Sequence, residues 1–263
     1  MEGADRVRDE GGEEDFVHFH IDPAAKKMEE ADRIAAIQPP GEEWTRADWK
    51  MSELRLRGLV PESGIIKLNL GAGEQRYKGY IGVDIRPTPA CDLQHDLLEP
   101  LPLPDGCVSH IFCSHTLEHL PLSRAPVIVR DWHRVLTKGG LLWGYVPDGQ
   151  TACALWLEAL TNEDEHATKR LMDIILGGYA TDPLAPREQS HCALYTDFIL
   201  KGVLLAAGFQ AVEVVREHPG KWDWRISFYA VKGVYPEQEL PEPTIYRGDQ
   251  VISGKEPPQE PSL

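Results

Sequence analysis

The feature that most limits the possible folds is an alternation of strand-like and helical segments between residues 65 and 232. The strand candidates are 65–70, 80–85, 91–94, 107–114, 141–146, 210–216 and 224–232. Alternating strands and helices are typical of an α/β fold, in which a mostly parallel sheet is covered by helices on both faces. The pattern therefore predicts a doubly wound α/β sheet.

Two of the helical segments carry recognisable start and stop signals. The segment 123–137 places its apolar residues on one side, offers Ser123 as a cap and ends at the glycines of 138–140. The segment TDFILKGVLLAAGF has Thr196 as a cap and Gly208 as a stop. Both segments are expected to be helices.

The last two strand candidates are joined only by the short stretch EHPGKWD. A parallel crossover needs a dozen or more residues, so this pair should form an antiparallel hairpin. The sheet is therefore expected to be parallel except for its reversed final strand. In such sheets, ligands bind beyond the carboxyl ends of the strands.

Changes in composition divide the chain into three parts. Residues 1–60 are predicted to form an acidic tail followed by helices at 27–37 and 43–59, and residues 61–234 form the α/β domain. Residues 235–263 are rich in Pro and Glu and are expected to form an extended arm.

The charge balance and the apolar pattern bear on partners and location. The chain has 27 Lys and Arg against 42 Asp and Glu, a formal net charge of −15, whereas a nucleic-acid partner requires clustered basic residues. No run approaches the roughly 18 uncharged apolar residues of a membrane span, and the acidic N-terminus does not resemble a signal peptide. We therefore expect a cytoplasmic protein that binds neither nucleic acid nor membrane. Five cysteines without a CxxC pair indicate reduced thiols.

The stretch IIKLNLGAGEQ (65–75) ends a strand candidate in a glycine loop, and three interpretations compete. A phosphate-binding loop requires GxxxxGK[ST], which is absent here. A nicotinamide or flavin site favours GxGxxG, but Arg76 occupies the third glycine position and Asp84 follows Gly71 by only 13 residues. From these residues alone, a glycine turn without a ligand stays open as the third interpretation.

The order of the motifs is more specific than any one of them. The series LNLGAGEQ, YIGVDI, HDLLEPLPLPDGCVSHIFCSHTLEHL and RVLTKGGLLWGYVPD resembles class I S-adenosylmethionine-dependent methyltransferases, most closely the type-11-like branch found in bacteria. The resemblance covers roughly residues 65–232. It implies a Rossmann-like sheet of seven strands with an antiparallel last strand, an enzymatic activity and S-adenosylmethionine as cofactor.

The resemblance also implies which residues hold the cofactor. These are Asn69, Gly71, Ala72, Gly73, Asp84, Ile85, Asp96, Leu97, Ser114 and His115. The two glycines would let the backbone approach the methionine part, Asp84 would accept both ribose hydroxyls, and Asp96 with Leu97 would hold the adenine. Asn69 departs from the family, because many members have an acidic residue at this position.

The long insertion at 147–195 is expected to form two helices and an irregular loop that act as a lid over the strand ends. Its candidate substrate-binding residues are Trp156, Tyr179, Arg187, His191 and Tyr195. The candidate catalytic bases are His115, His119 and His191, because imidazole titrates near neutral pH. His115 and His119 are spaced i, i+4, but without the HExxH order this match is weak, and no metal is expected.

These observations favour a methyltransferase that acts on an oxygen of a small molecule, such as a natural product or a glycan intermediate. The alternative is a non-catalytic S-adenosylmethionine-binding module or regulatory subunit. A nicotinamide oxidoreductase is disfavoured by Arg76. The expected partner is a small-molecule acceptor, and a homodimer is compatible with the chain.

Overall fold

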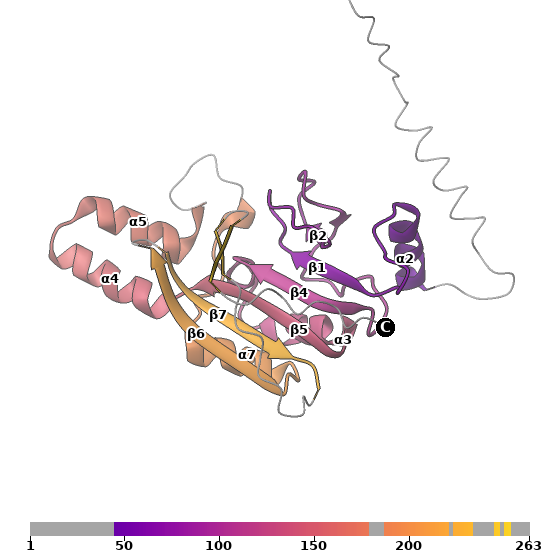
Figure 1. The fold of residues 1–263 in the computed structure, drawn as a ribbon. Helices are drawn as coiled ribbons and strands as arrows, with labels where there is room; N and C mark the ends of the chain where they lie inside the picture. Colours follow the sequence, from indigo (N-terminus) through magenta and orange to yellow (C-terminus); the bar gives the residue numbers. More distant parts are fainter. Residues whose placement is uncertain (1–44, 179–186, 221–222, 234–244, 248–249, 254–263) are drawn as a thin grey trace, which may run out of the picture. The chain divides into compact units, whose positions relative to one another are not determined.

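A computed structural model describes residues 45–178, 187–220, 223–233, 245–247 and 250–253 of the chain (Figure 1). The helix expected at 27–37, the candidate Tyr179 and most of the C-terminal arm lie outside the described residues. Within the arm, β8 (Ile245–Arg247) and β9 (Gln250–Ser253) form an antiparallel pair of strands.

The main sheet has seven strands in the order β3-β2-β1-β4-β5-β7-β6. The strands are β1 (Ile66–Leu70), β2 (Ile81–Asp84), β3 (Leu93–Gln94), β4 (Val108–Ser114), β5 (Leu136–Pro147), β6 (Ala211–Gly220) and β7 (Asp223–Val231). Neighbours from β3 to β5 are parallel, whereas β7 runs antiparallel to both β5 and β6. The predicted fold class, including the reversed final strand, is confirmed.

Five helices and two short 3₁₀ turns accompany this sheet in the described part of the chain. They are α2 (Arg46–Leu56), η1 (Leu117–His119), α3 (Ala125–Val135), α4 (Gly149–Thr161), α5 (Glu165–Leu176), η2 (Arg187–Gln189) and α7 (Asp197–Ala206). The insertion thus contributes the two expected helices, α4 and α5. Helices α3 and α7 pack beside each other and bury Trp132 and Leu204, respectively.

Helix boundaries match the prediction for α7 but not for α3. The Thr196 hydroxyl accepts a hydrogen bond from the Ile199 backbone N–H at 3.2 Å, as expected of a cap. Ser123 does not cap α3, because the helix begins one residue later, after Arg124, without any side-chain cap. The helix also ends at Val135 rather than in the glycines, since the chain joins the sheet from Leu136 onwards.

The two faces of the central strands differ in character. On one face Ile111 of β4 pairs with Leu142 of β5, and both are fully buried. On the other face Phe112 and Trp143 stack with ring centroids 4.3 Å apart, and Tyr77 packs edge-on against Phe112. The strand period of two therefore places the aliphatic core on one side and an aromatic row on the other.

The connection between β1 and β2 contains no helix over residues 71–80. Instead, the Gly71 and Ala72 backbone N–H groups both donate to the Val83 carbonyl, at 2.8 and 3.0 Å. The glycine loop is thereby held directly against β2. This short link leaves the carboxyl ends of β1 and β2 close together.

The insertion leaves and re-enters the domain at one place, the carboxyl end of β5. Asp148 caps α4 by accepting from the Thr151 backbone N–H at 3.1 Å, and it pairs with Tyr195 as a parallel bridge. The Gly149 N–H donates to the Tyr195 carbonyl at 2.9 Å. In Figure 1 the α4–α5 hairpin projects from this point, beyond the strands. None of the described helices is long and apolar enough to span a bilayer.

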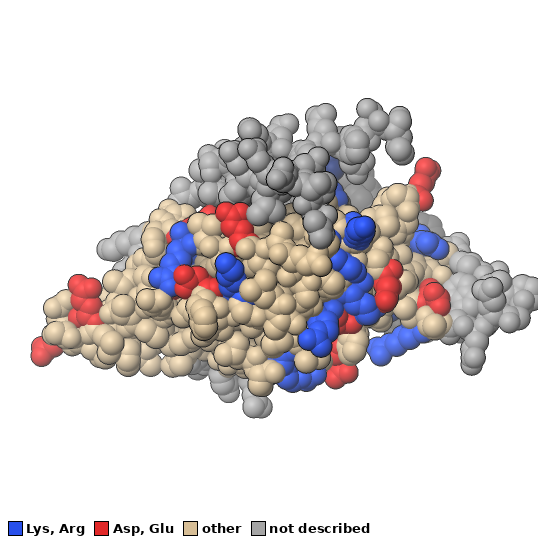
Figure 2. Space-filling view, turned by 90° about the horizontal axis from the view of Figure 1, so that it is seen from below, with Lys and Arg blue, Asp and Glu red and all other residues tan. Residues whose placement is uncertain are grey.

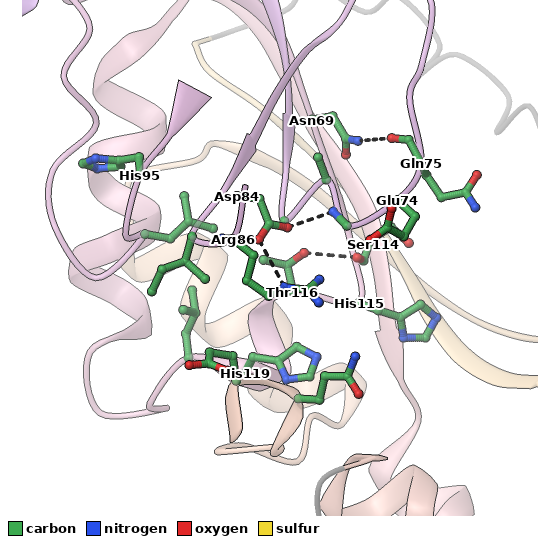
Figure 3. Close-up of a pocket in the computed structure, with 18 of the residues that line it drawn as sticks. Asn69, Glu74, Gln75, Asp84, Arg86, His95, Ser114, His115, Thr116 and His119 are labelled. Carbon is green, nitrogen blue, oxygen red and sulfur yellow. Dashed lines mark hydrogen bonds and ion pairs between the residues drawn. The ribbon is translucent and has the colours of Figure 1, made fainter. Parts of the chain in front are cut away.

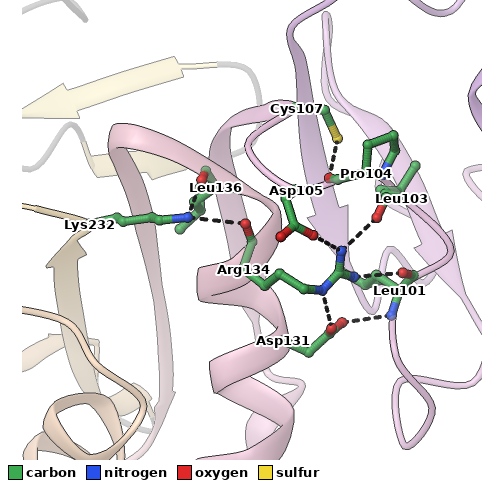
Figure 4. Close-up of polar contacts among 9 residues, drawn as sticks. All are labelled: Leu101, Leu103, Pro104, Asp105, Cys107, Asp131, Arg134, Leu136 and Lys232. Atoms are coloured by element: carbon green, nitrogen blue, oxygen red, sulfur yellow. Dashed lines mark hydrogen bonds and ion pairs between the residues drawn. The ribbon is translucent and has the colours of Figure 1, made fainter.

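Arg134 fixes the segment between β3 and β4 to helix α3 (Figure 4). Its guanidinium donates to the Leu101 and Leu103 carbonyls at 2.9 and 2.8 Å, and it bonds the carboxylates of Asp105 and Asp131 at 2.7 Å. Asp131 in turn accepts from the Leu101 N–H at 2.7 Å. The guanidinium is planar and carries five N–H donors, so it can bond all four of these acceptor groups at once.

We expect Arg134→Ala to lower the free energy of unfolding by about 2 kcal/mol, since several charge-assisted bonds are lost at a half-buried position. Chemical denaturation followed by far-UV circular dichroism measures the change. Arg130→Ala on the same helix is the matched control, because Arg130 donates only to the Ala206 carbonyl from an exposed position. Equal losses in both variants would contradict the assigned role.

Candidate active site

A pocket of about 590 Å³ opens at the carboxyl ends of β1, β2 and β4, with the insertion supplying its far wall (Figure 3). Its lining residues from the domain include Asn69, Gly71, Ala72, Gly73, Asp84, Ile85, Asp96, Leu97, Ser114, His115, Thr116 and His119. Those from the insertion are Asp173, Gly178, Glu188, Gln189 and His191. The pocket lies where open α/β sheets bind their ligands.

The two glycines of the loop serve different purposes. Gly71 adopts φ +67°, and a Cβ there would overlap the Thr116 hydroxyl and lie 2.7 Å from its Cγ2. Thr116 is held in place because its hydroxyl donates to the Leu70 carbonyl at 3.0 Å. Gly73 also has a positive φ, +53°, but a Cβ there would meet nothing closer than 4.0 Å. Gly71 thus makes room for Thr116, whereas the open space at Gly73 borders the pocket.

Asp84 ends β2 and holds the glycine loop with its carboxylate. The carboxylate is almost fully buried, and its Oδ2 accepts from the Gly73 N–H at 2.8 Å while Oδ1 accepts from the Arg86 N–H at 2.9 Å. Each carboxylate oxygen has a second lone-pair site. Asp84 can therefore hold the loop and still accept hydrogen bonds from a ligand in the pocket.

The side chains of Asn69 and Asp96 form hydrogen bonds with nearby backbone groups at two other edges of the pocket. The Asn69 amide donates to the Gln75 carbonyl at 3.1 Å, so the departure from an acidic residue has a structural use in this loop. Asp96 Oδ1 accepts from the Leu98 N–H at 2.9 Å. Beside Asp96, the apolar side chains of Ile85 and Leu97 line the same part of the pocket.

His115 follows β4 in a left-handed conformation, with φ +49°, which is uncommon for a residue with a Cβ. Its Nδ1 lies 3.0 Å from Oε1 of Glu118, a carboxylate that is buried. Partial desolvation opposes the charged imidazole, but the hydrogen bond and charge of Glu118 outweigh it and raise the pKa of His115 above its usual value. The same contact lowers the pKa of Glu118 against the effect of its burial.

The structure brings all ten cofactor candidates and all three catalytic candidates to the pocket wall. Of the substrate candidates, His191 lines the pocket, whereas Trp156 and Tyr195 do not, and Tyr195 is buried in the core. Arg187 begins η2, but its side chain lies outside the described part, as does Tyr179.

Sequence reasoning assigned no role to Thr116 or Glu118. Glu118 could have been found, because a residue three positions after His115 can turn back towards it within one helical turn. Thr116 carried no such signal. Its contact with Gly71 depends on how β1 and β4 lie side by side.

Residues 68–144 match the family model described as a methyltransferase domain. No curated protein matches the chain. Similar solved structures include an S-adenosylmethionine-dependent methyltransferase from Archaeoglobus fulgidus, with 16% identity, 72% of this chain and 95% of that chain covered, and a TM-score of 0.44.

Two further solved structures have similar scores. One is the 1,6-didemethyltoxoflavin N1-methyltransferase from Burkholderia thailandensis, solved with 1,6-didemethyltoxoflavin and S-adenosylhomocysteine (14% identity, 80% and 90% covered, TM-score 0.43). The other is the CMeT domain of the citrinin polyketide synthase (14% identity, 80% of this chain covered, TM-score 0.43). The chain spans 57% of that domain's length.

Proposed function

We propose that the chain, whose residues 68–144 match a methyltransferase domain, is a class I S-adenosylmethionine-dependent methyltransferase that acts on an oxygen atom of a small molecule. The observation that carries the proposal is one pocket lined by the glycine loop, Asp84 and His115, whose Nδ1 is paired with the buried carboxylate of Glu118. One side of the pocket is suited to the cofactor, and the other side offers a group that can accept a proton.

The residues present fit the cofactor. The spare lone pairs of Asp84 can accept two ribose hydroxyls, and Ile85 and Leu97 offer apolar surfaces for the adenine. The open space at Gly73 leaves room for the methionine part. When bound, S-adenosylmethionine supplies an electrophilic methyl group on a sulfonium.

His115 is the group proposed to accept the proton of the acceptor hydroxyl. A carboxylate oxygen only accepts hydrogen bonds, so Nδ1 carries the hydrogen towards Glu118, and Nε2 is left to face the acceptor. The carboxylate orients the ring and stabilises its charged form. Alignment of the two reactants in the pocket can lower the activation barrier by on the order of 7–11 kcal/mol, more than the general base contributes.

The charge of the molecule supports a small acceptor rather than a nucleic acid. The chain has a net charge of −15, and on the face shown in Figure 2 basic side chains stand beside acidic ones. A surface that tracks phosphates would instead gather Lys and Arg alone. We further propose that the acceptor belongs to natural-product or glycan biosynthesis and that the enzyme works in the cytoplasm.

Two measurements test the proposal in sequence. Calorimetric titration with S-adenosylhomocysteine determines whether the cofactor binds. Incubation with radiolabelled S-adenosylmethionine and a panel of phenols, sugar alcohols, amines and thiols then shows which class of atom is methylated. Binding without transfer to any class would favour the non-catalytic module, and preferred transfer to amines or thiols would overturn methylation on oxygen.

We expect His115→Ala to lower kcat roughly 100-fold, the lower end of what a general base contributes, while the Kd of S-adenosylmethionine changes less than threefold. Steady-state kinetics with the acceptor found above gives kcat, and calorimetry gives Kd. His218→Ala is the control, because this histidine is exposed on β6. A kcat equal to that of the control would remove His115 from the mechanism.

A further inference from the structure

Within the described part of the chain, three metal-ligating side chains converge beside the pocket: His119 and His191 line it, and Glu118 is buried next to them. Glu118 and His119 belong to η1, and His191 comes from the insertion just after η2. One ligand atom from each of them lies within 4.8 Å of the others. The imidazole rings of His119 and His191 meet edge to face, with centroids 4.9 Å apart.

Only one of the two oxygens of the Glu118 carboxylate has a hydrogen-bond partner among the described residues. Its residue is 1% exposed, and Oε1 is bonded to His115, but Oε2 is buried without a hydrogen-bond partner. Leaving an ionised carboxylate oxygen buried and unpaired is costly. A cation beside Oε2 would remove that cost.

Both histidines are oriented so that one ring nitrogen has a free lone pair. His119 Nδ1 lies 3.0 Å from the Ser190 carbonyl, which only accepts, so in the neutral ring Nδ1 carries the hydrogen and Nε2 carries the lone pair. The His191 ring donates to the Ile174 backbone carbonyl, while its Nδ1 is buried without a partner. A backbone carbonyl that fixes the outer nitrogen of a histidine is typical of metal ligands.

The backbone holds the two segments together. The Glu118 carbonyl accepts from the N–H groups of Cys192 and Ala193, at 2.7 and 3.0 Å, and the His191 N–H donates to the Leu176 carbonyl at 2.9 Å. These bonds place His191 against η1 independently of any side-chain contact. Backbone hydrogen bonds of the fold therefore bring Glu118, His119 and His191 together.

We propose that Glu118, His119 and His191 bind a divalent transition-metal ion, zinc being the reference ion, in the wall of the pocket. Two imidazoles and one carboxylate form a common ligand set for catalytic zinc and for other first-row metals. Ligand atoms at about 2.0–2.2 Å from one tetrahedral ion lie roughly 3.5 Å apart, so the three side chains would have to close by about 1 Å to bind it. Three protein ligands leave one position of the ion open.

The open position gives the metal a role, which rests on the proposed function. An acceptor hydroxyl bound to the ion would have a lower pKa and would lose its proton to His115 more readily. His119 and His191 would then be ligands rather than bases, because their free lone pairs are used by the metal. The substrate class narrows accordingly to molecules with a hydroxyl that can coordinate a cation.

Metal binding can be measured without any turnover. We would strip the full chain with a chelator and titrate it with zinc against a chromophoric competitor, expecting one tight equivalent. His119→Ala and His191→Ala should each weaken binding at least tenfold, and His218→Ala should leave it unchanged. Cobalt added to the wild-type chain should give visible absorption bands of nitrogen and oxygen ligation. Circular dichroism shows whether each variant is folded.

The result that overturns the proposal is zinc binding that both variants retain, or a wild-type chain without a tight equivalent and without cobalt bands. The cobalt spectrum decides the question even if a variant fails to fold. Cofactor calorimetry on the metal-free chain separates the two proposals. Methyl transfer that is indifferent to metal would end the catalytic role of the ion alone, and zinc bound at the three residues without any methyl transfer would end the proposed function alone.

Discussion

Asp84→Ala should weaken the binding of S-adenosylmethionine by about 100-fold or more. Two hydrogen bonds from ribose hydroxyls to a buried carboxylate are together worth about 3 kcal/mol, and alanine removes both. The same change also removes the acceptor of the Gly73 N–H, which loosens the loop beside the cofactor. Calorimetric titration with S-adenosylmethionine and with S-adenosylhomocysteine measures the loss.

Asp92→Ala separates the loss of cofactor contacts from loosening of the sheet edge. The side chains of Asp84 and Asp92 are both 7% exposed, and both carboxylates accept from backbone N–H groups. Asp92 accepts from the Gly82 N–H of β2 at 2.9 Å and pairs with Arg76. It does not line the pocket. We expect the Asp92 variant to lose stability but to bind cofactor within a few-fold of the wild-type chain. Similar affinities in the two variants would contradict the ribose assignment.

Gly71→Ala should lower the free energy of unfolding by about 3–4 kcal/mol. The left-handed backbone at this position costs a residue with a Cβ about 1–2 kcal/mol, and forcing an atom into the space of the buried Thr116 side chain adds a similar or larger amount. Chemical denaturation measures the change. Cofactor affinity should fall as well, because Gly71 and Gly73 belong to one loop.

Two further variants separate the two costs at Gly71. Gly73 has a positive φ, but the space around its Cβ position is open. We therefore expect Gly73→Ala to lower the free energy of unfolding by only about 1 kcal/mol. Thr116→Ala removes the overlapping hydroxyl and Cγ2, so the double variant with Gly71→Ala should recover part of the loss. If Gly71→Ala and Gly73→Ala are equally destabilising, the steric role of Thr116 is wrong.

Much of the fold could be predicted because its signals are local. The stretch EHPGKWD is too short for a crossover, which requires the antiparallel pair of β6 and β7. Thr196 caps α7 through a bond to a residue three positions away. The start of α3 could not be predicted as well, since Ser123 and Arg124 both precede a helical segment and the packing of the helix on the sheet selects where it begins.

The candidate site was predictable in part for the same reason. Glycines after β1 and an acid at the end of β2 lie at the same edge of any parallel sheet, so Gly73 and Asp84 meet as a consequence of topology. The aromatic candidates of the insertion were chosen without that constraint. Trp156 and Tyr195 lie away from the pocket lining, because the sequence does not specify how a helical hairpin packs on a sheet.

The sequence by itself determined which segments form the main strands, the antiparallel direction of the final pair and the edge of the sheet that carries the pocket. Those properties follow from apolar periodicity, connection lengths and glycine positions, all of which act over a few residues. Only the tertiary structure decided that Thr116 fills the space at Gly71 and that His191 reaches Glu118 and His119. These contacts join segments far apart in the chain, and they exist because the backbone bonds of the folded domain hold those segments together.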